Sequence, residues 1–343
     1  MPRPEPEANI EPAPVERRIA RDRIAKQRRG DTDLDTIRLL HFTDPHLGLG
    51  LSRVPLRDWL GKRIIGGANL LRGRARRFEE APWKIAALAD FARDRHVDAV
   101  VCTGDLTSLG TNAELAVARA ELETFFSAPL GFVCLPGNHD LYTRSVIREQ
   151  RFEQRFADGI ASDMPELCTD GPWPLVRLWG ERVAVVAVNS ARPNLPWQSS
   201  GRVPDIQLIG LRAALEHEAL QDRFILVATH YAPLRDDGTP DTPQHGLQNA
   251  DAFLRATSSV RRGAILCGHI HHAFHYPSRR RGLDAPDVFC GGSATMESHE
   301  AAWWFRIDGA RASIRRVLWN GSAWSLVSED RAIRLGTEPD DGE

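Results

Sequence analysis

Five short apolar segments of this chain each end in a residue type that can bind a metal ion. The endings, in chain order, are Asp44-Pro-His46, Gly104-Asp105, Gly137-Asn138-His139-Asp140, His230 and Gly268-His269-Ile270-His271. In open α/β sheets, ligand sites lie outside the carboxyl ends of the strands. We therefore expect these side chains to converge, which constrains the fold because all five segments must be strands that end at one edge.

The first half of the chain alternates between strand and helix patterns. Strands are expected at residues 37–43, 98–103 and 131–135, with helices at 84–95 and 112–126 between them. This order predicts a largely parallel, buried sheet with helices outside it. The inner face of the second helix is expected to hold Ala113, Val117, Ala120 and Leu122.

The second half is rich in strand patterns around one predicted helix at 205–218. Strands are expected at 175–178, 182–189, 224–230, 264–267, 288–290, 304–307 and 312–318. The last of them are joined by short turns, which suggests an antiparallel edge on a second sheet.

We expect one large domain, 37–325, between a disordered tail rich in Arg and Pro (1–36) and a C-terminal tail (326–343). Hydrophobic residues make up 42% of the 343 residues, enough for a sizeable core. No run approaches the ~20 apolar residues of a membrane span, which excludes an integral membrane protein. The net charge of −2 gives no global field that would attract nucleic acid.

The cysteines and the first residues indicate the compartment. The five cysteines are odd in number and contain no Cys-x-x-Cys pair, which argues against a disulfide framework and for a reducing environment. The first thirty residues lack the apolar stretch of a secretory signal. We therefore expect a cytoplasmic protein.

The spacing of the polar residues supports a single compact site. Asp44 and His46 are two residues apart, as are His269 and His271, and in an extended chain this spacing places both side chains of a pair on one side. The glycines at 104, 137 and 268 leave room for the backbone to approach the site closely.

The residue types point to a pair of metal ions. Two carboxylates, one amide and four imidazoles exceed the ligand set of a single zinc ion and suit two divalent ions that share a carboxylate, ~3.5–4 Å apart. Mixed oxygen and nitrogen ligands favour Mn, Fe or Zn over Mg or Ca. Such a pair activates a water and holds phosphoryl oxygens, so hydrolysis of a phosphate ester is the chemistry that needs this arrangement.

The ordered set of five blocks resembles the calcineurin-like metallophosphoesterases, from about residue 37 to residue 294. The resemblance implies an α/β fold, a four-layer α/β/β/α sandwich of two mixed sheets, with a dinuclear metal site at the strand ends. It also implies attack on phosphorus by a hydroxide that bridges the two ions.

Site roles follow from the same resemblance, position by position. The first metal would be held by Asp44, His46 and His271. The second would be held by Asn138, His230 and His269, with Asp105 bridging both. His139 is not a ligand in this family, and would protonate or steady the leaving group.

Sequence differences from other branches of this superfamily narrow the class of enzyme that the chain resembles. Protein Ser/Thr phosphatases carry a second Asp-Arg pair after Gly-Asp and end the third block in Glu, whereas this chain has Gly104-Asp-Leu-Thr-Ser-Leu-Gly110 and Asp140. These forms resemble the bacterial phosphodiesterase branch, which includes cyclic-nucleotide phosphodiesterases. The common UDP-2,3-diacylglucosamine hydrolase has Arg where His139 stands, so that subtype does not fit.

A basic amphipathic insertion, 51–77, keeps a second substrate class open. Its part 57–77 mixes Trp, Ile and Leu with seven cationic residues, a composition suited either to a flap over the sheet or to peripheral contact with the inner face of a membrane. A distinct, chlamydial-type UDP-2,3-diacylglucosamine hydrolase has similar insertions. A lipid-linked pyrophosphate is therefore the alternative to a small-molecule substrate.

Two further classes of function remain as alternatives. The retromer subunit of this fold is a scaffold with a degraded metal site, but here every expected ligand type is present. A nuclease could use Arg279-Arg280-Arg281, yet no aromatic residues for base stacking are interleaved there, and no specific nucleic acid partner is expected. The natural substrate, the native metals and the oligomeric state are left open.

Other polar residues near the blocks have simpler interpretations. We expect His41 to pack inside the first strand, and His272 and His275 to be polar residues beside a turn. Asp140 would either orient His139 or cap a helix that begins near Thr143.

Overall fold

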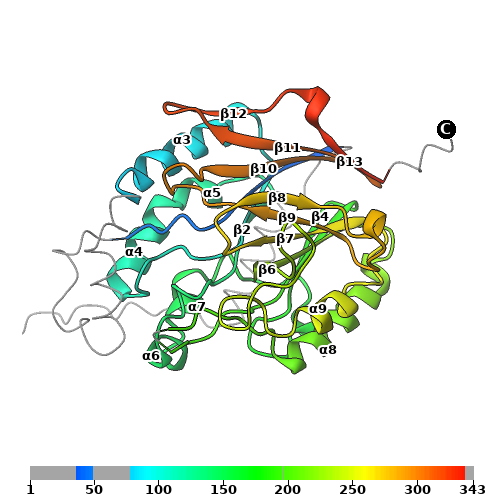
Figure 1. The fold of residues 1–343 in the computed structure, drawn as a ribbon, viewed down its shortest axis with the longest axis horizontal. Coiled ribbons are helices and arrows are strands. Elements are labelled where there is room, and N and C mark those ends of the chain that lie inside the picture. Colours follow the sequence, from blue (N-terminus) through cyan, green and yellow to red (C-terminus); the bar gives the residue numbers. More distant parts are fainter. Residues whose placement is uncertain (1–35, 49–77, 196, 337–343) are drawn as a thin grey trace, which may run out of the picture. The chain divides into compact units, whose positions relative to one another are not determined.

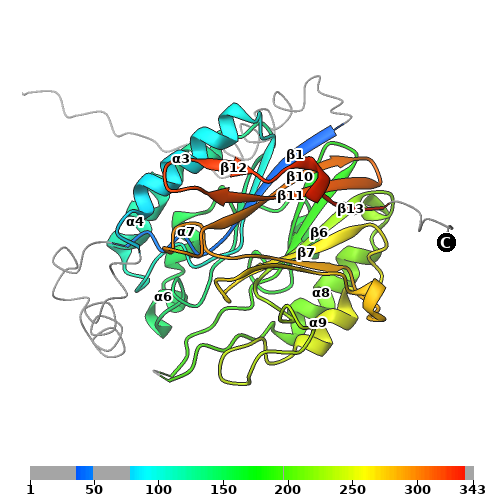
Figure 2. The ribbon, with the colours of Figure 1, turned by 45° about the horizontal axis from the view of Figure 1, so that its top comes forward.

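Two β-sheets packed face to face form the centre of the fold, with helices on the outer side of each sheet (Figures 1 and 2). The computed structural model describes residues 36–48, 78–195 and 197–336. All of these residues belong to one compact unit, Asp35–Glu343. The predicted four-layer α/β/β/α arrangement of two mixed sheets is confirmed.

The first sheet combines a parallel half and an antiparallel half. In order, its strands are β12 (Trp324–Leu326), β11 (Arg311–Trp319), β10 (Ala301–Asp308), β1 (Thr36–Phe42), β2 (Ala99–Cys102) and β3 (Gly131–Cys134), and β13 (Ile333–Leu335) also pairs with β11. β1, β2 and β3 are parallel, so the loops after β1, β2 and β3 leave the sheet at one edge. The other strands pair antiparallel.

The second sheet has four parallel strands between two antiparallel edge strands. In order, its strands are β4 (Leu175–Trp179), β5 (Val183–Ala187), β6 (Phe224–Tyr231), β7 (Gly263–Gly268), β9 (Asp287–Gly291) and β8 (Ala273–Tyr276). β5, β6, β7 and β9 run parallel, while β4 and β8 pair antiparallel. β5 is buried along its whole length. An apolar run without alternation is typical of such a central strand.

Helices cover both outer faces. On the side of the first sheet lie α3 (Ala81–Asp94), α4 (Asn112–Glu121) and α5 (Glu123–Phe126), and against the second sheet lie α8 (Asp205–Glu216) and α9 (Ala250–Ala256), as Figures 1 and 2 show. Two short helices, α6 (Arg144–Arg148) and α7 (Arg151–Arg155), follow the third block. Single 3-10 turns occupy Pro165–Leu167, Glu218–Leu220, Arg279–Arg281 and Glu329–Arg331. Within the residues that the structure describes, no helix has the length and apolar character needed to cross a membrane.

Aromatic side chains join the two sheets. Phe289 of β9 packs against Trp303 and Phe305 of β10, with ring centroids 5.2 Å and 5.3 Å apart. The indole nitrogen of Trp303 donates a 2.7 Å hydrogen bond to the carbonyl oxygen of Cys290. The rings are buried, and their geometry is that of edge-to-face pairs, which add to the stability gained from burial alone.

Two expectations about the C-terminal part are corrected. The last strands do not form an edge of the second sheet. They belong to the first sheet, where β10 pairs antiparallel with β1 and β11 pairs with β10. The predicted tail 326–343 contains β13, whose residues Ile333–Leu335 pair with Ala312–Ile314 of β11. The predicted tail 1–36, apart from residue 36, and the insertion 51–77 lie outside the described residues.

His41 packs inside β1, as its position in the strand predicts. Its side chain is fully buried, and Nε2 lies 3.0 Å from the hydroxyl of Thr103. Burial lowers the pKa of His41 from its ordinary 6.5 to about 3, and the charge of Asp44 opposes this shift without outweighing it. The imidazole is therefore neutral in the folded protein at neutral pH.

The buried imidazole makes the free energy of unfolding depend on pH. Because the pKa of His41 is lower in the folded chain, the unfolded chain binds an additional proton between pH 6.5 and about 3. The contribution of His41 to the free energy of unfolding is complete above pH 6.5. It is lost as the pH falls, by about 2 kcal/mol between pH 6.5 and pH 5. Urea denaturation at these two pH values should show a smaller loss in His41→Gln than in the wild type. An equal loss in both proteins would contradict the assignment.

Candidate metal centre

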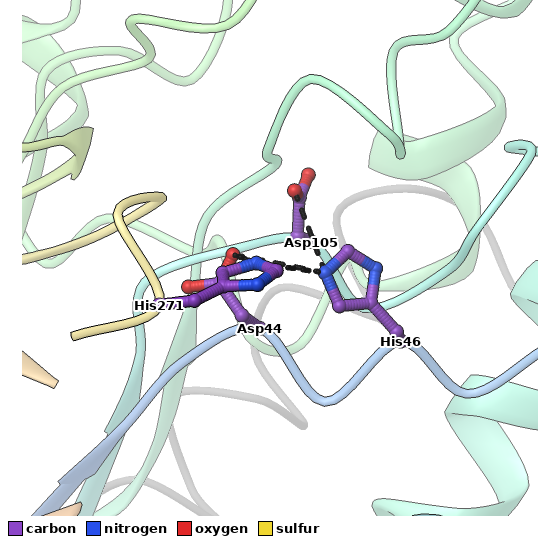
Figure 3. Close-up of side chains that lie close together, drawn as sticks. All are labelled: Asp44, His46, Asp105 and His271. Atoms are coloured by element: carbon purple, nitrogen blue, oxygen red, sulfur yellow. Dashed lines mark hydrogen bonds and ion pairs between the residues drawn. The ribbon is translucent and has the colours of Figure 1, made fainter. Parts of the chain in front are cut away.

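The first cluster of ligand-type side chains gathers at the ends of β1, β2 and β7. Atoms of Asp44, His46, Asp105 and His271 that can bind a metal all lie within 4.8 Å of one another (Figure 3). Nε2 of His271 is 3.1 Å from Oδ1 of Asp44 and 3.2 Å from Nε2 of His46. All four side chains come from loops that leave the strands at this edge, so the predicted convergence is observed for them.

The second cluster lies beside the first. It joins Asp105 to His230, near the end of β6, and His269, directly after β7, again within 4.8 Å. Asn138, from the loop after β3, places its amide oxygen 3.2 Å from Nε2 of His230. The structure therefore brings together all seven residues that the resemblance assigns to the two metals.

One oxygen of Asp105 faces both clusters. Oδ2 lies 3.9 Å from Nε2 of His46 in the first cluster and 3.6 Å from Nε2 of His230 in the second. The other oxygen, Oδ1, accepts a 2.8 Å hydrogen bond from the backbone N–H of His139. This hydrogen bond holds Oδ1, so that Oδ2 is the oxygen directed toward both clusters.

Five of the seven side chains sit on left-handed backbone. The φ angles are 52° at Asp44, 42° at His46, 53° at Asp105, 70° at His269 and 55° at His271. Outside glycine such angles are uncommon and cost roughly 1–3 kcal/mol each, and they cluster at functional sites. The predicted extended backbone is therefore wrong, since the chain turns sharply after each strand. Asp44 and His46 nevertheless share one cluster as predicted, whereas His269 and His271 belong to different clusters.

Two glycines are required by close approach of the chain. A Cβ at Gly268 would overlap the hydroxyl of Thr43, and a Cβ at Gly137 would overlap the carboxylate of Asp105. The Thr43 hydroxyl donates a 2.7 Å hydrogen bond to Oδ2 of Asp44. Any larger residue at either position would displace a carboxylate of the clusters.

Backbone carbonyls orient three of the imidazoles that belong to the clusters. Nδ1 of His46 donates to the oxygen of Thr107 at 3.2 Å, and Nδ1 of His230 donates to Thr103 at 2.7 Å. Nε2 of His269 donates to the oxygen of His245 at 2.9 Å. A carbonyl can only accept, so the proton of each ring lies on that nitrogen, and the other nitrogen keeps the lone pair that a metal needs.

His139 stands next to the clusters without joining either of them. Its ring centroid lies 5.0 Å from that of His46, and its Nδ1 donates a 2.6 Å hydrogen bond to the carbonyl oxygen of Ser108. The ring also stacks on that of Tyr142, with the two ring centroids 5.8 Å apart. The ring is therefore held at the rim of the site, with Nε2 as the nitrogen that can exchange a proton.

Asp140 has neither of the two roles that the sequence left open. Its fully buried carboxylate accepts hydrogen bonds from the backbone N–H groups of Leu106, Thr107 and Gly137, and from the Thr107 hydroxyl, at 2.9–3.0 Å. These donors come from the loops that carry Asp105 and Asn138. Asp140 thus ties the two loops together.

The electrostatics of the clusters fit divalent cations. Burial raises the pKa of Asp105, and the charges of Asp44 and Asp140 raise it further. Burial alone would raise the pKa of Asp44 as well, but the imidazoles of His271, His230 and His46 outweigh it and hold this pKa below its usual range. In the part of the chain that the structure describes, no Lys or Arg forms an ion pair with Asp44 or Asp105. Buried carboxylates that lack a Lys or Arg partner and lie beside four imidazoles suit divalent metal ions.

The remaining histidines lie outside both clusters. His272 is exposed, with Asp236 4.0 Å away, and His275 pairs with Asp287 at 2.8 Å and stacks on Phe289. Neither is part of the metal centre.

Two aromatic residues beside the clusters were missed by sequence reasoning. The Phe78 ring lies 4.7 Å from that of His46 and 6.4 Å from that of His271. The Tyr231 ring lies 4.2 Å from that of His269. The available signals were weak: Tyr231 follows His230 in the strand, and Phe78 directly follows the basic insertion.

Comparisons with known proteins agree with this geometry. The family model described as calcineurin-like phosphoesterase matches residues 37–273. A dimetal phosphatase from Danio rerio is similar in structure, with a TM-score of 0.54 at 14% identity over 82% of this chain and 95% of that one. The purple acid phosphatase PPD1 from yellow lupin (Lupinus luteus) seeds is also similar in structure, with a TM-score of 0.52 at 9% identity. The match covers 87% of this chain and 53% of that one. At such identities the two structures support the fold alone. No curated protein sequence matches this chain.

Proposed function

This chain belongs to the calcineurin-like phosphoesterase family, whose members are hydrolases that use two divalent metal ions, and from that premise we propose that it cleaves a phosphodiester or pyrophosphate bond. The observation that carries the proposal is the position of Asp105, whose Oδ2 is shared between two clusters of ligand atoms. The proposed substrate class is a small phosphodiester of the cyclic-nucleotide type.

The chain's own residues account for the parts of the reaction around the metals. Two divalent ions in such a centre supply an activated water and polarise the phosphoryl oxygens. One ion would be held by Asp44, His46 and His271. The other would be held by Asn138, His230 and His269, and Asp105 would bind both ions. The carbonyl oxygens of Thr107, Thr103 and His245 keep the imidazoles in the orientation that binding needs.

His139 is proposed to assist departure of the leaving group. With Nδ1 held by the carbonyl of Ser108, the ring can deliver a proton only from Nε2. The proton would pass to the ester oxygen as its bond to phosphorus breaks, so that the leaving group departs as an alcohol.

The second block favours a diester over a monoester. The cluster side chains in the described part of this protein are carboxylates, imidazoles and one amide, so the two divalent ions would meet the charge of a bound phosphate. The chain lacks the second Asp-Arg pair that protein phosphatases of this superfamily carry after Gly-Asp, and its Gly104-Asp-Leu-Thr form resembles the phosphodiesterase branch.

A substrate panel on the Mn-loaded full chain tests the proposal. Under one condition it compares cyclic AMP, UDP-2,3-diacylglucosamine, a single-stranded oligonucleotide and p-nitrophenyl phosphate. Preferred turnover of the cyclic nucleotide supports the proposal. Preferred turnover of the monoester overturns it.

The lipid-linked alternative has its own arm in this panel. Preference for UDP-2,3-diacylglucosamine would assign a pyrophosphate substrate and make membrane contact through 57–77 the next question. That segment lies outside the described residues, so the contact stays a prediction.

A further inference from the structure

One imidazole of the first cluster is oriented by a sulfur atom. Nδ1 of His271 lies 3.1 Å from Sδ of Met296, whereas the corresponding nitrogens of His46, His230 and His269 face backbone carbonyls. A thioether sulfur can only accept a hydrogen bond, so it can hold the proton of His271 on Nδ1 once Nε2 binds a metal ion. Without a metal ion, Oδ1 of Asp44 competes for this proton, since it lies 3.1 Å from Nε2. With the proton on Nδ1, the lone pair is left on Nε2, the nitrogen that faces Asp44 and His46.

The backbone of Met296 is tied to the loop that carries Asp44. The residue is 9% exposed, and its backbone N–H donates to the hydroxyl oxygen of Ser293 at 3.1 Å. The Ser293 hydroxyl donates in turn to the carbonyl oxygen of Asp44 at 2.8 Å. The backbone that carries the sulfur is therefore connected through two hydrogen bonds to the backbone of a residue of the same cluster.

The rest of the segment 293–296 is fastened to the loop after β1. The hydroxyl of Thr295 donates to the carbonyl oxygen of Pro45 at 2.8 Å, and the N–H of Ala294 donates to that of Thr43 at 2.9 Å. The buried ammonium of Lys84 donates to the carbonyl oxygen of Thr295 and pairs with Glu300 at 2.6 Å. The segment thus moves with the loop that carries Asp44 and His46.

We propose that Met296 is a positioning residue of the first cluster: its sulfur accepts the Nδ1–H of His271 and so directs Nε2 of that ring toward Asp44 and His46. The proposal rests on the proposed metal centre but not on the identity of the substrate. Partners that orient a ligand histidine also raise its basicity, and losing one typically costs ~10–100-fold in metal affinity. Since sulfur is a weak acceptor, the lower end of this range applies.

The test measures Mn²⁺ affinity by calorimetry on the full chain after removal of metal with a chelator. Met296→Leu keeps the size of the side chain and removes the acceptor, so one Mn²⁺ site should weaken about tenfold. Met164→Leu is the matched control, because Met164 is also buried and lies in the core beside the second sheet. Met296→Gln supplies an amide oxygen and should restore the affinity.

A second readout separates orientation from packing. In the chain loaded with diamagnetic Zn²⁺, the Nδ1–H signal of His271, assigned by its loss in His271→Ala, should exchange with solvent slowly in the wild type and faster in Met296→Leu. Unchanged affinity in Met296→Leu, an equal loss in Met164→Leu, an unaltered rate of Nδ1–H exchange, or failure of Met296→Gln to restore binding would each overturn the proposal. Hydrolysis is not measured, so failure of the proposed function is distinguished from failure of this one.

Discussion

Replacing Asp105 with alanine is expected to reduce hydrolysis of bis-p-nitrophenyl phosphate by the Mn-loaded chain to the rate without protein. The physical reason is that Oδ2 of Asp105 is the oxygen common to both clusters, 3.9 Å from Nε2 of His46 and 3.6 Å from Nε2 of His230. Without it the two clusters no longer share a ligand, and the metal content should fall below two ions per chain. Turnover is measured by absorbance, and metal content by elemental analysis after dialysis.

Two controls make the Asp105 result interpretable. Asp105→Asn keeps an oxygen that can accept the 2.8 Å hydrogen bond from the N–H of His139 and removes only the charge. It should fold and still lose activity. Asp98→Asn alters the carboxylate at the opposite end of the same strand, β2, where Asp98 accepts from the N–H of Arg38, and should keep normal turnover. Full activity in Asp105→Ala would refute the bridging role.

The second large effect is expected for His139→Ala. His139 lies outside both clusters, so the variant should bind as much metal as the wild type. Loss of general acid assistance should slow turnover by about 10²–10⁴ for a diester with an alkoxide leaving group. The loss should be smaller with p-nitrophenolate, which departs without a proton. Comparing kcat for the two kinds of substrate measures this.

His272→Ala is the matched control for His139→Ala. His272 also follows a block with ligand residues, but its side chain is exposed. Its removal should leave both rates unchanged. If His139→Ala loses metal, or slows both substrates equally, then His139 supports the structure of the site and does not donate the proton.

The helix that follows β2 shows where local patterns misled the interpretation. The predicted inner face contained Ala113, Val117, Ala120 and Leu122, but the buried residues of α4 are Glu114, Leu115 and Ala118. Of the four predicted residues only Leu122, which caps the end of the helix, is buried. Glu114 is buried because it forms a capping box with Thr111: each side chain accepts from the backbone N–H of the other residue. A charged residue at this position satisfies the helix end, which a count of apolar residues does not register.

The sequence alone determined which residues are proposed as metal ligands and in what order they follow. Each follows, or lies at the end of, an apolar segment, and parallel strands must end at a common edge, so convergence could be argued before any coordinates were considered. The layered fold followed from the same alternation of strands and helices. These conclusions depend on patterns within short segments and on the family resemblance.

Only the tertiary structure decided how those side chains are oriented and how they are divided between the two clusters. The left-handed backbone at Asp44, Asp105 and His269, and the placement of His269 and His271 in different clusters, depend on hydrogen bonds between loops far apart in the chain. The pairing of β10 with β1 is equally remote in sequence. The contact of Met296 with His271 likewise joins residues that are distant in the sequence. Side-chain periodicity reports which face of a segment is apolar, but not which distant segment covers it, because that is settled by packing and hydrogen bonding across the whole fold.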